Sequence, residues 1–209
     1  MLCPLCSYQY TWESQPLINS IPAGNLALST AILCSGSLPT KTITLFKLMN
    51  CSTINESTYF KYQRNYLNQA IQTTWIEHQN SIIASFKKNK DRLILGGDGR
   101  CDSPGYCAKF GSYTFLELQN NVITDIQLVQ SNEVPNSCHM EKEGLVRGIE
   151  FITSKGLEVE LLITDRHGQV SKWVKENMKD TLHKYDIWHV AKGFKKKIEK
   201  LAKTKDCEL

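Results

Sequence analysis

Residues 93–106 read LILGGDGRCDSPGY, and this stretch decides how the second half of the chain is interpreted. Three aliphatic residues that run into two glycines predict a buried β-strand followed by a turn. Asp98 comes directly after the glycines, where an aspartate often caps such a turn. The alternative is that Asp98 is held at the edge of a sheet in order to bind something positive, with the glycines leaving room for a close approach.

The rest of the region 91–209 alternates between the two periodicities of strands and helices. Strands are expected at 93–98, 112–118, 122–130, 159–167 and 184–190, and helices at 139–156, 170–177 and 191–203. The order β-β-β-α-β-α-β-α predicts an α/β fold with a mixed sheet and helices on its faces. The second and third strands form a hairpin with its turn at 119–121, and Gly156 is expected to end the first of these helices.

A second apolar strand, VELLITDRH, also leads into an aspartate, Asp165. In this element order the strands that carry Asp98 and Asp165 can be neighbours, which would bring both carboxylates to one sheet edge. Adjacent carboxylates repel, and a hard divalent cation such as Mg²⁺ relieves that repulsion. The simpler alternative is that each aspartate only caps the turn after its strand.

The region 19–90 has the pattern of a small helical domain. Pro39 marks one helix start, and Asn55 or Ser57 is expected to cap the next helix. Two short helices around a turn permit a helix-turn-helix, in which Lys61 and Arg64 would contact DNA. A helical packing domain without DNA contacts is the alternative, and the polar segment 86–91 is the expected domain boundary.

The first residues contain a CxxC pair, Cys3 and Cys6. A structural zinc site needs four ligands, and no second pair follows, so residues 1–18 are interpreted as the remnant of a zinc ribbon. Zinc is expected only if another ligand pair precedes Met1. The eight cysteines are irregularly spaced and no export signal is evident, which indicates free thiols rather than a disulfide framework.

The net charge of +4 is concentrated near the C-terminus. Between Lys172 and Lys205, eleven lysines against four acidic residues leave a local charge of +7. Such a segment can bind DNA phosphates, although a lysine-rich helix is also an ordinary solvated face. The candidate DNA contacts there are Lys192, Lys195, Lys196 and Lys197. No membrane-spanning segment is expected, because no apolar run approaches about 20 residues.

Several short phrases make the chain resemble a known family: TWESQP, GDGRCDSPG, LVQSNEV, MEKEG, TDRH and YDIWHVAKG. They resemble those of transposase-derived proteins of animal genomes, and the likeness extends from about Trp12 to Lys200. The resemblance implies a ribonuclease-H-like core of the kind found in cut-and-paste DNA transposases, acting in DNA transposition and recombination in the nucleus. It also implies a DDE/D triad that binds two Mg²⁺ or Mn²⁺ ions, with Asp98 and Asp165 as the first two acids. Asp102 competes with Asp98 for the first position.

The third acid of such a triad lies on a helix beyond the strand containing DIWH. Only Glu199 and Glu208 remain there, and neither matches the expected position, so we expect the core to be incomplete at its C-terminal end and to lack the full triad. Glu141 and Glu143 open the helix after the hairpin, where ribonuclease-H enzymes place an acid, but favourable interaction with the helix dipole is the simpler interpretation.

Glu143 and three further residues are candidates for supporting the site. Arg166 and His167 directly follow Asp165 and could contact the scissile phosphate or position a water, and His189 is expected to close the next strand near the same edge. A histidine at a strand end is more often structural. Trp173 and Trp188 are interpreted as core residues.

The sequence therefore predicts a DNA-binding, transposase-like protein with metal-dependent phosphodiester cleavage and strand-transfer chemistry. A domesticated DNA-binding module without catalysis is the alternative, and a ribonuclease-H-type nuclease is the third hypothesis. A homo-oligomer is compatible with all three, whereas a membrane partner is not expected.

Overall fold

The computed structural model describes residues 4–89, 92–104 and 107–202. The chain forms two compact units, Met1–Glu77 and His78–Leu209. The division lies within helix α4 (Asn68–Asn89), ahead of the boundary expected at 86–91. The end of α4 belongs to the second unit because Ile83 and Phe86 are buried in that unit's core. Cys3 and Glu208 lie outside the described residues.

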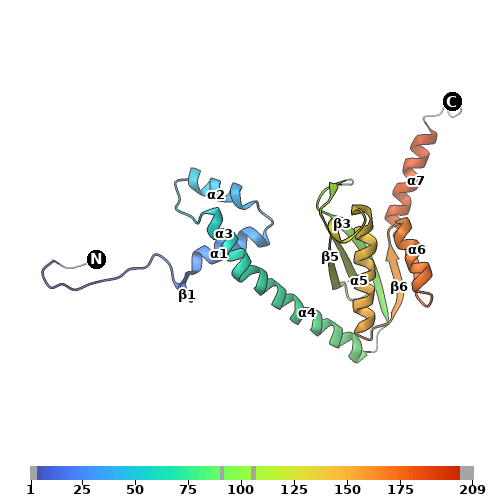
Figure 1. Ribbon diagram of the computed structural model, residues 1–209, viewed down its shortest axis with the longest axis horizontal. Coiled ribbons are helices and arrows are strands. Elements are labelled where there is room, and N and C mark those ends of the chain that lie inside the picture. The colour runs from blue at the N-terminus through green and yellow to red at the C-terminus, as the bar shows by residue number, and fades with distance from the viewer. Residues whose placement is uncertain (1–3, 90–91, 105–106, 203–209) are drawn as a thin grey trace. The chain divides into compact units, whose positions relative to one another are not determined.

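The first unit is a small helical unit preceded by a short hairpin (Figure 1). Its elements are β1 (Leu17–Ile18), β2 (Ile21–Pro22), α1 (Ala23–Cys34), α2 (Pro39–Leu48), α3 (Glu56–Tyr62) and a π-helix (Gln63–Leu67) that leads into α4. Pro39 occupies the first turn of α2, and the Asn55 side chain caps α3 by accepting a hydrogen bond from the Thr58 amide, as expected. The helices enclose a core of Ile32, Ile43, Ile54 and Tyr59.

The turn between α2 and α3 runs from Met49 to Asn55. It is longer than the three or four residues typical of a helix-turn-helix. Lys61 in the last turn of α3 and Arg64 in the π-helix are both exposed to solvent. The first unit thus leaves both cations accessible, but its turn departs from the expected motif.

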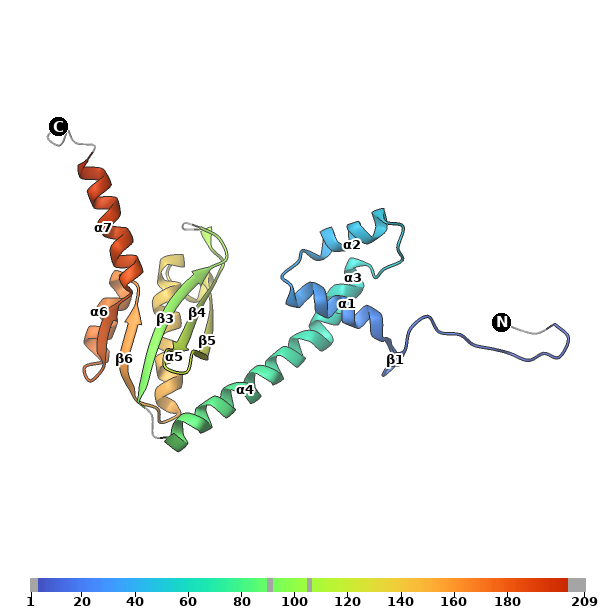
Figure 2. The same ribbon diagram turned by 180° about the vertical axis from the view of Figure 1, so that it is seen from behind.

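The second unit is an α/β unit built on a five-stranded mixed sheet (Figures 1 and 2). Its strands are β3 (Leu93–Cys101), β4 (Phe110–Glu117), β5 (Val122–Gln130), β6 (Val159–Thr164) and β7 (Leu182–Tyr185). Its helices after the hairpin are α5 (Met140–Ser154), α6 (Gly168–Asn177) and α7 (Ile187–Leu201). The strand order is β5-β4-β3-β6-β7, with β3, β4 and β5 antiparallel and β6 and β7 parallel to β3. The α/β class and the order of elements are therefore confirmed.

One face of this sheet carries the hydrophobic core. Leu93, Leu95 and Phe115 point into it from the strands, and α5, α6 and the end of α4 supply the opposing side chains. Helix α5 approaches β4 closely because it has glycine where it crosses Tyr113 and Phe115. A Cβ at Gly144 would lie 2.5 Å from the Tyr113 Cβ, and a Cβ at Gly148 would overlap the Phe115 ring. The end of α5 is set by Gly156, whose φ of +73° is readily adopted only by glycine.

The end of α4 is also joined to the sheet by a polar contact. The Gln79 side-chain amide donates to the Thr124 carbonyl and to the Asp125 carboxylate, each at 3.0 Å. Burial raises the pKa of Asp125, while the hydrogen bonds from Gln127 and Gln79 lower it. A buried carboxylate needs such partners, which fixes this part of α4 against β5.

Strand boundaries differ from the sequence expectation in β3 and β7, and β6 ends at Thr164 rather than at residue 167. Strand β3 continues through Asp98 to Cys101, because its far part still pairs with β4, so Asp98 lies within a strand rather than at its end. The expected strand at 184–190 stops at Tyr185, because the Asp186 side chain accepts a hydrogen bond from the Trp188 amide and starts α7. In the part of the chain that the structure describes, no helix is long and apolar enough to cross a membrane.

Candidate functional site

Asp98 and Asp165 lie at the same level of the sheet. Strands β3 and β6 are parallel, and their last paired residues are Gly96 and Ile163. Each aspartate is two residues beyond that pair, at the point where the β3–β6 ladder ends. The convergence expected from the sequence is thus produced by the parallel register, although Asp98 lies inside its strand.

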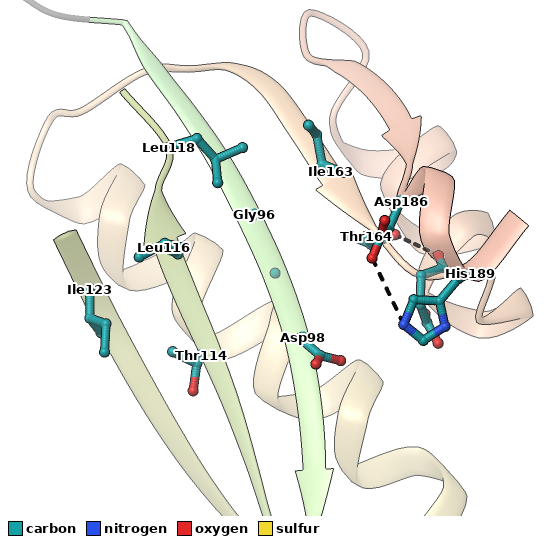
Figure 3. Close-up of a pocket in the computed structure, with 12 residues that line it drawn as sticks. Gly96, Asp98, Thr114, Leu116, Leu118, Ile123, Ile163, Thr164, Asp186 and His189 are labelled. Atoms are coloured by element: carbon teal, nitrogen blue, oxygen red, sulfur yellow. Dashed lines mark hydrogen bonds and ion pairs between the residues drawn. The ribbon is translucent and has the colours of Figure 1, made fainter. Parts of the chain in front are cut away.

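Both aspartates line a cavity of about 550 Å³ on the sheet face opposite to α5 (Figure 3). Apolar side chains form one part of its wall, namely Leu116, Leu118, Ile123 and Ile163. The acidic part contains Asp98, Asp165 and Asp186, together with His189. In Figure 3 the Asp98 carboxylate is turned toward the side of the cavity where His189 lies. The cavity therefore has an apolar wall on one side and several carboxylates along its lining.

Glu141, in the first turn of α5, is a further carboxylate close to Asp98 and Asp165. Its side chain packs next to Gly99, where an added Cβ would lie 2.5 Å from the Glu141 Cγ. Burial raises the pKa of Glu141 to about 7, with further contributions from the Asp165 and Asp98 charges and from a hydrogen bond with the Asp165 side chain. Glu141 is therefore partly protonated near neutral pH and can donate a hydrogen bond to Asp165.

Tyr113 on β4 lies beneath the same carboxylates. Its hydroxyl is buried, has no hydrogen-bond partner among the described residues, and would lie 2.5 Å from a Cβ at Gly97. Burial is the main cause that raises the pKa of Tyr113, and the charges of Glu141, Asp165 and Asp98 raise it further. Three carboxylates thus act on one neutral phenol, and Gly97 is required because the Tyr113 ring occupies the space of a side chain.

Asp186 and His189 bring the start of α7 into the cavity. The Asp186 amide donates to the Thr164 carbonyl at 2.8 Å, which ties the beginning of α7 to the end of β6. The His189 Nε2 lies 3.9 Å from an Asp186 carboxylate oxygen. His189 is therefore at the site, as expected, but it reaches it from the first turn of a helix rather than from a strand end.

The remaining sequence candidates are placed differently. The exposed Asp102 carboxylate accepts hydrogen bonds from the Lys109 amide and the Ser103 hydroxyl, so it caps the loop after β3 and does not line the cavity. Glu143, chosen as a supporting acid, is ion-paired with Arg147 at 2.8 Å. Of the two glutamates that open α5, Glu141 is the one near Asp98 and Asp165.

Arg166 and His167 follow Asp165 in the loop between β6 and α6. Arg166 is exposed, and the His167 amide donates to the Asp165 carboxylate at 2.9 Å. Asp165 thus caps the turn before α6 while it also lines the cavity. The His167 Nδ1 is buried and has no partner among the described residues.

The proposed nucleic-acid contacts on α7 are all surface residues. Lys192, Lys195, Lys196 and Lys197 occur on a helix that has no buried side chain. Glu199, weighed as a third acid, is ion-paired with Lys195 at 3.9 Å on this exposed helix. Cys6 is an exposed free thiol. These placements leave the lysines accessible to a ligand and give Glu199 no part in the cavity.

The donor chemistry of the cavity suits a hard divalent cation. Burial is the main cause of the raised pKa of Glu141, and repulsion from the Asp165 and Asp98 charges adds to it. Mg²⁺ or Mn²⁺ would relieve that repulsion through oxygen ligands. Asp98 lines the cavity on the open face of the sheet. Glu141 belongs to α5 and packs beside Gly99, on the face of the sheet that α5 covers. Within residues 4–89, 92–104 and 107–202, no three His, Cys, Asp or Glu side chains are arranged to hold a metal ion. Asp98 and Asp165 are therefore the best placed cation ligands.

Comparisons of the chain with protein-family models, with curated proteins and with solved structures found no match. Two acidic residues of this site were not chosen from the sequence. Glu141 could have been preferred over Glu143, because Arg147 lies four residues after Glu143, at the spacing of an ion pair. For Asp186 there was no signal except its position as an N-cap before IWHV.

Proposed function

We propose that this chain is a transposase-like protein that binds DNA, with a ribonuclease-H-like core that cleaves or joins phosphodiesters with the help of Mg²⁺ or Mn²⁺. The observation that carries the proposal is the convergence of Asp98 and Asp165 two residues beyond one register pair, with Glu141 close enough to feel the charges of both. A nuclear location and a role in DNA transposition are part of the same proposal, and they rest on the resemblance of the sequence phrases.

The topology supports the proposal. A three-stranded antiparallel part is followed by α5, and then by two parallel strands that are each followed by a helix. This is the order expected for a ribonuclease-H-like core, and it leaves the parallel strand ends open at the carboxylates. Ligands of open α/β sheets bind beyond the carboxyl ends of the strands.

In this proposal Asp98 and Asp165 would hold a divalent cation, which would supply activation of the attacking hydroxyl and charge neutralisation at the phosphodiester. Glu141 carries a proton that it can share with Asp165, so it can adjust the charge of the site near neutral pH. Arg166 is exposed beside Asp165 and is free to contact a phosphate. Leu116, Leu118 and Ile123 give one side of the cavity an apolar lining.

The test is a nicking and strand-transfer assay on labelled duplex DNA with Mg²⁺ or Mn²⁺. Asp98→Ala and Asp165→Ala should each abolish the metal-dependent product, because each removes a ligand. Asp102→Ala is the matched control and should retain activity, because Asp102 only caps the loop after β3. Equal activity in the Asp98 and Asp102 variants would refute the assignment of the site.

A DNA-binding module without catalysis is the second candidate. It is favoured by the absence, among the described residues, of three side chains arranged to hold a metal ion. Isothermal titration calorimetry with Mn²⁺ separates the two: a catalytic two-ion site should saturate at a stoichiometry of about two. DNA binding without any saturable Mn²⁺ site would favour the module.

A further inference from the structure

Trp188 is exposed and its ring contacts that of His189, which lines the carboxylate cavity, although Trp188 was expected in the core. It lies on the first turn of α7, between Ile187 and His189, and 59% of its surface is accessible. Its neighbours Asp186 and His189 both line the cavity. A large aromatic side chain therefore stands in solvent beside the residues that would act on a phosphodiester.

The position of Trp188 on the helix separates it from the apolar surface of α7. At about 100° per residue, Ile187, Phe194, Ile198 and Leu201 share one stripe, and all four are exposed. Trp188 lies about a quarter of a turn away from that stripe, on the same face as Lys192 and Lys195. Burial of the apolar stripe by a further protein segment would therefore not require Trp188.

Cations accompany the ring along this face. The Lys192 Nζ lies 4.5 Å from the centroid of the Trp188 ring, a cation–π contact. Lys195 follows one turn later on the same side of the helix. The His189 ring meets the Trp188 ring edge-on at a centroid distance of 4.8 Å, which helps to hold the indole in place. An aromatic platform followed by lysines has the features of a site for single-stranded nucleic acid, in which bases stack and phosphates follow the cations.

We infer that Trp188 is a base-stacking platform for an unpaired nucleotide next to the cleavage site, with Lys192 and Lys195 contacting the phosphates of the same strand. This inference rests on the proposed function and gives it a substrate class: DNA whose end is single-stranded or melted at the carboxylates. A base inside a duplex is already stacked on both sides, so only an unpaired base can lie on the indole. Trp188 positions the strand and takes no part in the proton or phosphoryl chemistry.

The experiment compares binding of a blunt duplex with that of the same duplex carrying a three-nucleotide single-stranded tail. It uses the full chain and fluorescence anisotropy, with EDTA present so that no cleavage occurs. The wild type should bind the tailed duplex about tenfold more tightly, since stacking of one base on an aromatic ring is worth about that factor. Trp188→Leu should lose this preference, and Trp188→Phe should retain part of it.

Phe194→Leu is the matched control, because it makes the same aromatic-to-leucine change at an exposed position on another face of α7. It should keep the full preference for the tailed duplex. The inference is overturned if Trp188→Leu keeps the preference, or if Phe194→Leu loses it to the same extent. Either result is compatible with metal-dependent cleavage by the wild type, so the proposed function is tested separately. A wild type that binds neither DNA would overturn both the inference and the proposed function.

Discussion

The Glu141 side chain lies close enough to that of Asp165 for the two carboxyl groups to interact, which links the first turn of α5 to the end of β6. The pKa of Glu141 is about 7, mainly because of burial and then because of the Asp165 and Asp98 charges, against an ordinary value of 4.5. This pair links the stability of the sheet unit to pH, and it makes the site sensitive to any cation that changes its charge.

In the metal-free protein, the free energy of unfolding should fall as pH rises from 4.5 to above 7. The folded state holds the Glu141 proton more tightly than the unfolded state, so its stabilising effect is complete below pH 4.5 and lost above the folded pKa. The difference corresponds to about 3 kcal/mol for a fully buried group, and partial exposure reduces it to on the order of 2 kcal/mol. Urea denaturation at pH 4.5, 6 and 8 measures it.

The control for this pH dependence is Glu141→Gln, which removes the titrating group and keeps its size. The variant should lose most of the decline in stability between pH 4.5 and 8, whereas Glu143→Gln should retain it, because Glu143 pairs with Arg147 instead. An unchanged pH profile in Glu141→Gln would show that another group causes the decline.

Divalent cations should raise the melting temperature of the wild type and should do so more strongly at higher pH. A cation bound by Asp98 and Asp165 competes with the proton of Glu141, so its apparent affinity rises as pH passes through about 7. Differential scanning fluorimetry with Mn²⁺ at pH 6 and pH 8 checks both the shift and its direction. Asp98→Asn should abolish the shift and Asp102→Asn should not; equal shifts in both variants would place the cation elsewhere.

The close contact between α5 and β4 depends on the glycines of α5. Gly148→Ala should destabilise the protein by about 1–3 kcal/mol, because the added methyl group overlaps the Phe115 ring in a packed core. Gly193→Ala in α7 is the control: an added Cβ there meets no atom within 4 Å, so the change should be neutral or stabilise by up to about 1 kcal/mol. Urea midpoints of the two variants give the comparison, and similar midpoints would contradict the close approach of α5 to the sheet.

Much of the sheet unit could be predicted because its strands and helices differ clearly in periodicity. The hairpin turn at 119–121, the stop at Gly156 and the neighbouring positions of β3 and β6 all followed from local patterns and from the order of elements. Local patterns could not show that β3 extends to Cys101, because the far part of β3 is held by pairing with β4 rather than by its own residues.

The site could be predicted only in part for a related reason. Asp98 and Asp165 follow apolar strands and were visible in the sequence, whereas Glu141 depends on how α5 packs against β3. Trp188 was placed in the core because an aromatic within DIWHV fits a buried strand, but the Asp186 cap turns this segment into an exposed helix. In each case a contact between distant segments, or a cap, outweighed the local pattern.

The lysines of α7 provide the last prediction, on the salt dependence of DNA binding. At about 100° per residue, Lys192, Lys195 and Lys196 lie within one side of the helix, while Lys197 points away from them. If that side contacts a duplex, the triple variant with glutamine at positions 192, 195 and 196 should reduce the slope of log affinity against log salt by about 3, close to 0.9 per phosphate contact. Lys197→Gln should leave the slope unchanged. The double variant Lys61→Gln and Arg64→Gln, measured in the same way, shows whether the first unit also contributes to the salt dependence. A triple variant with the wild-type slope would identify α7 as a solvated face.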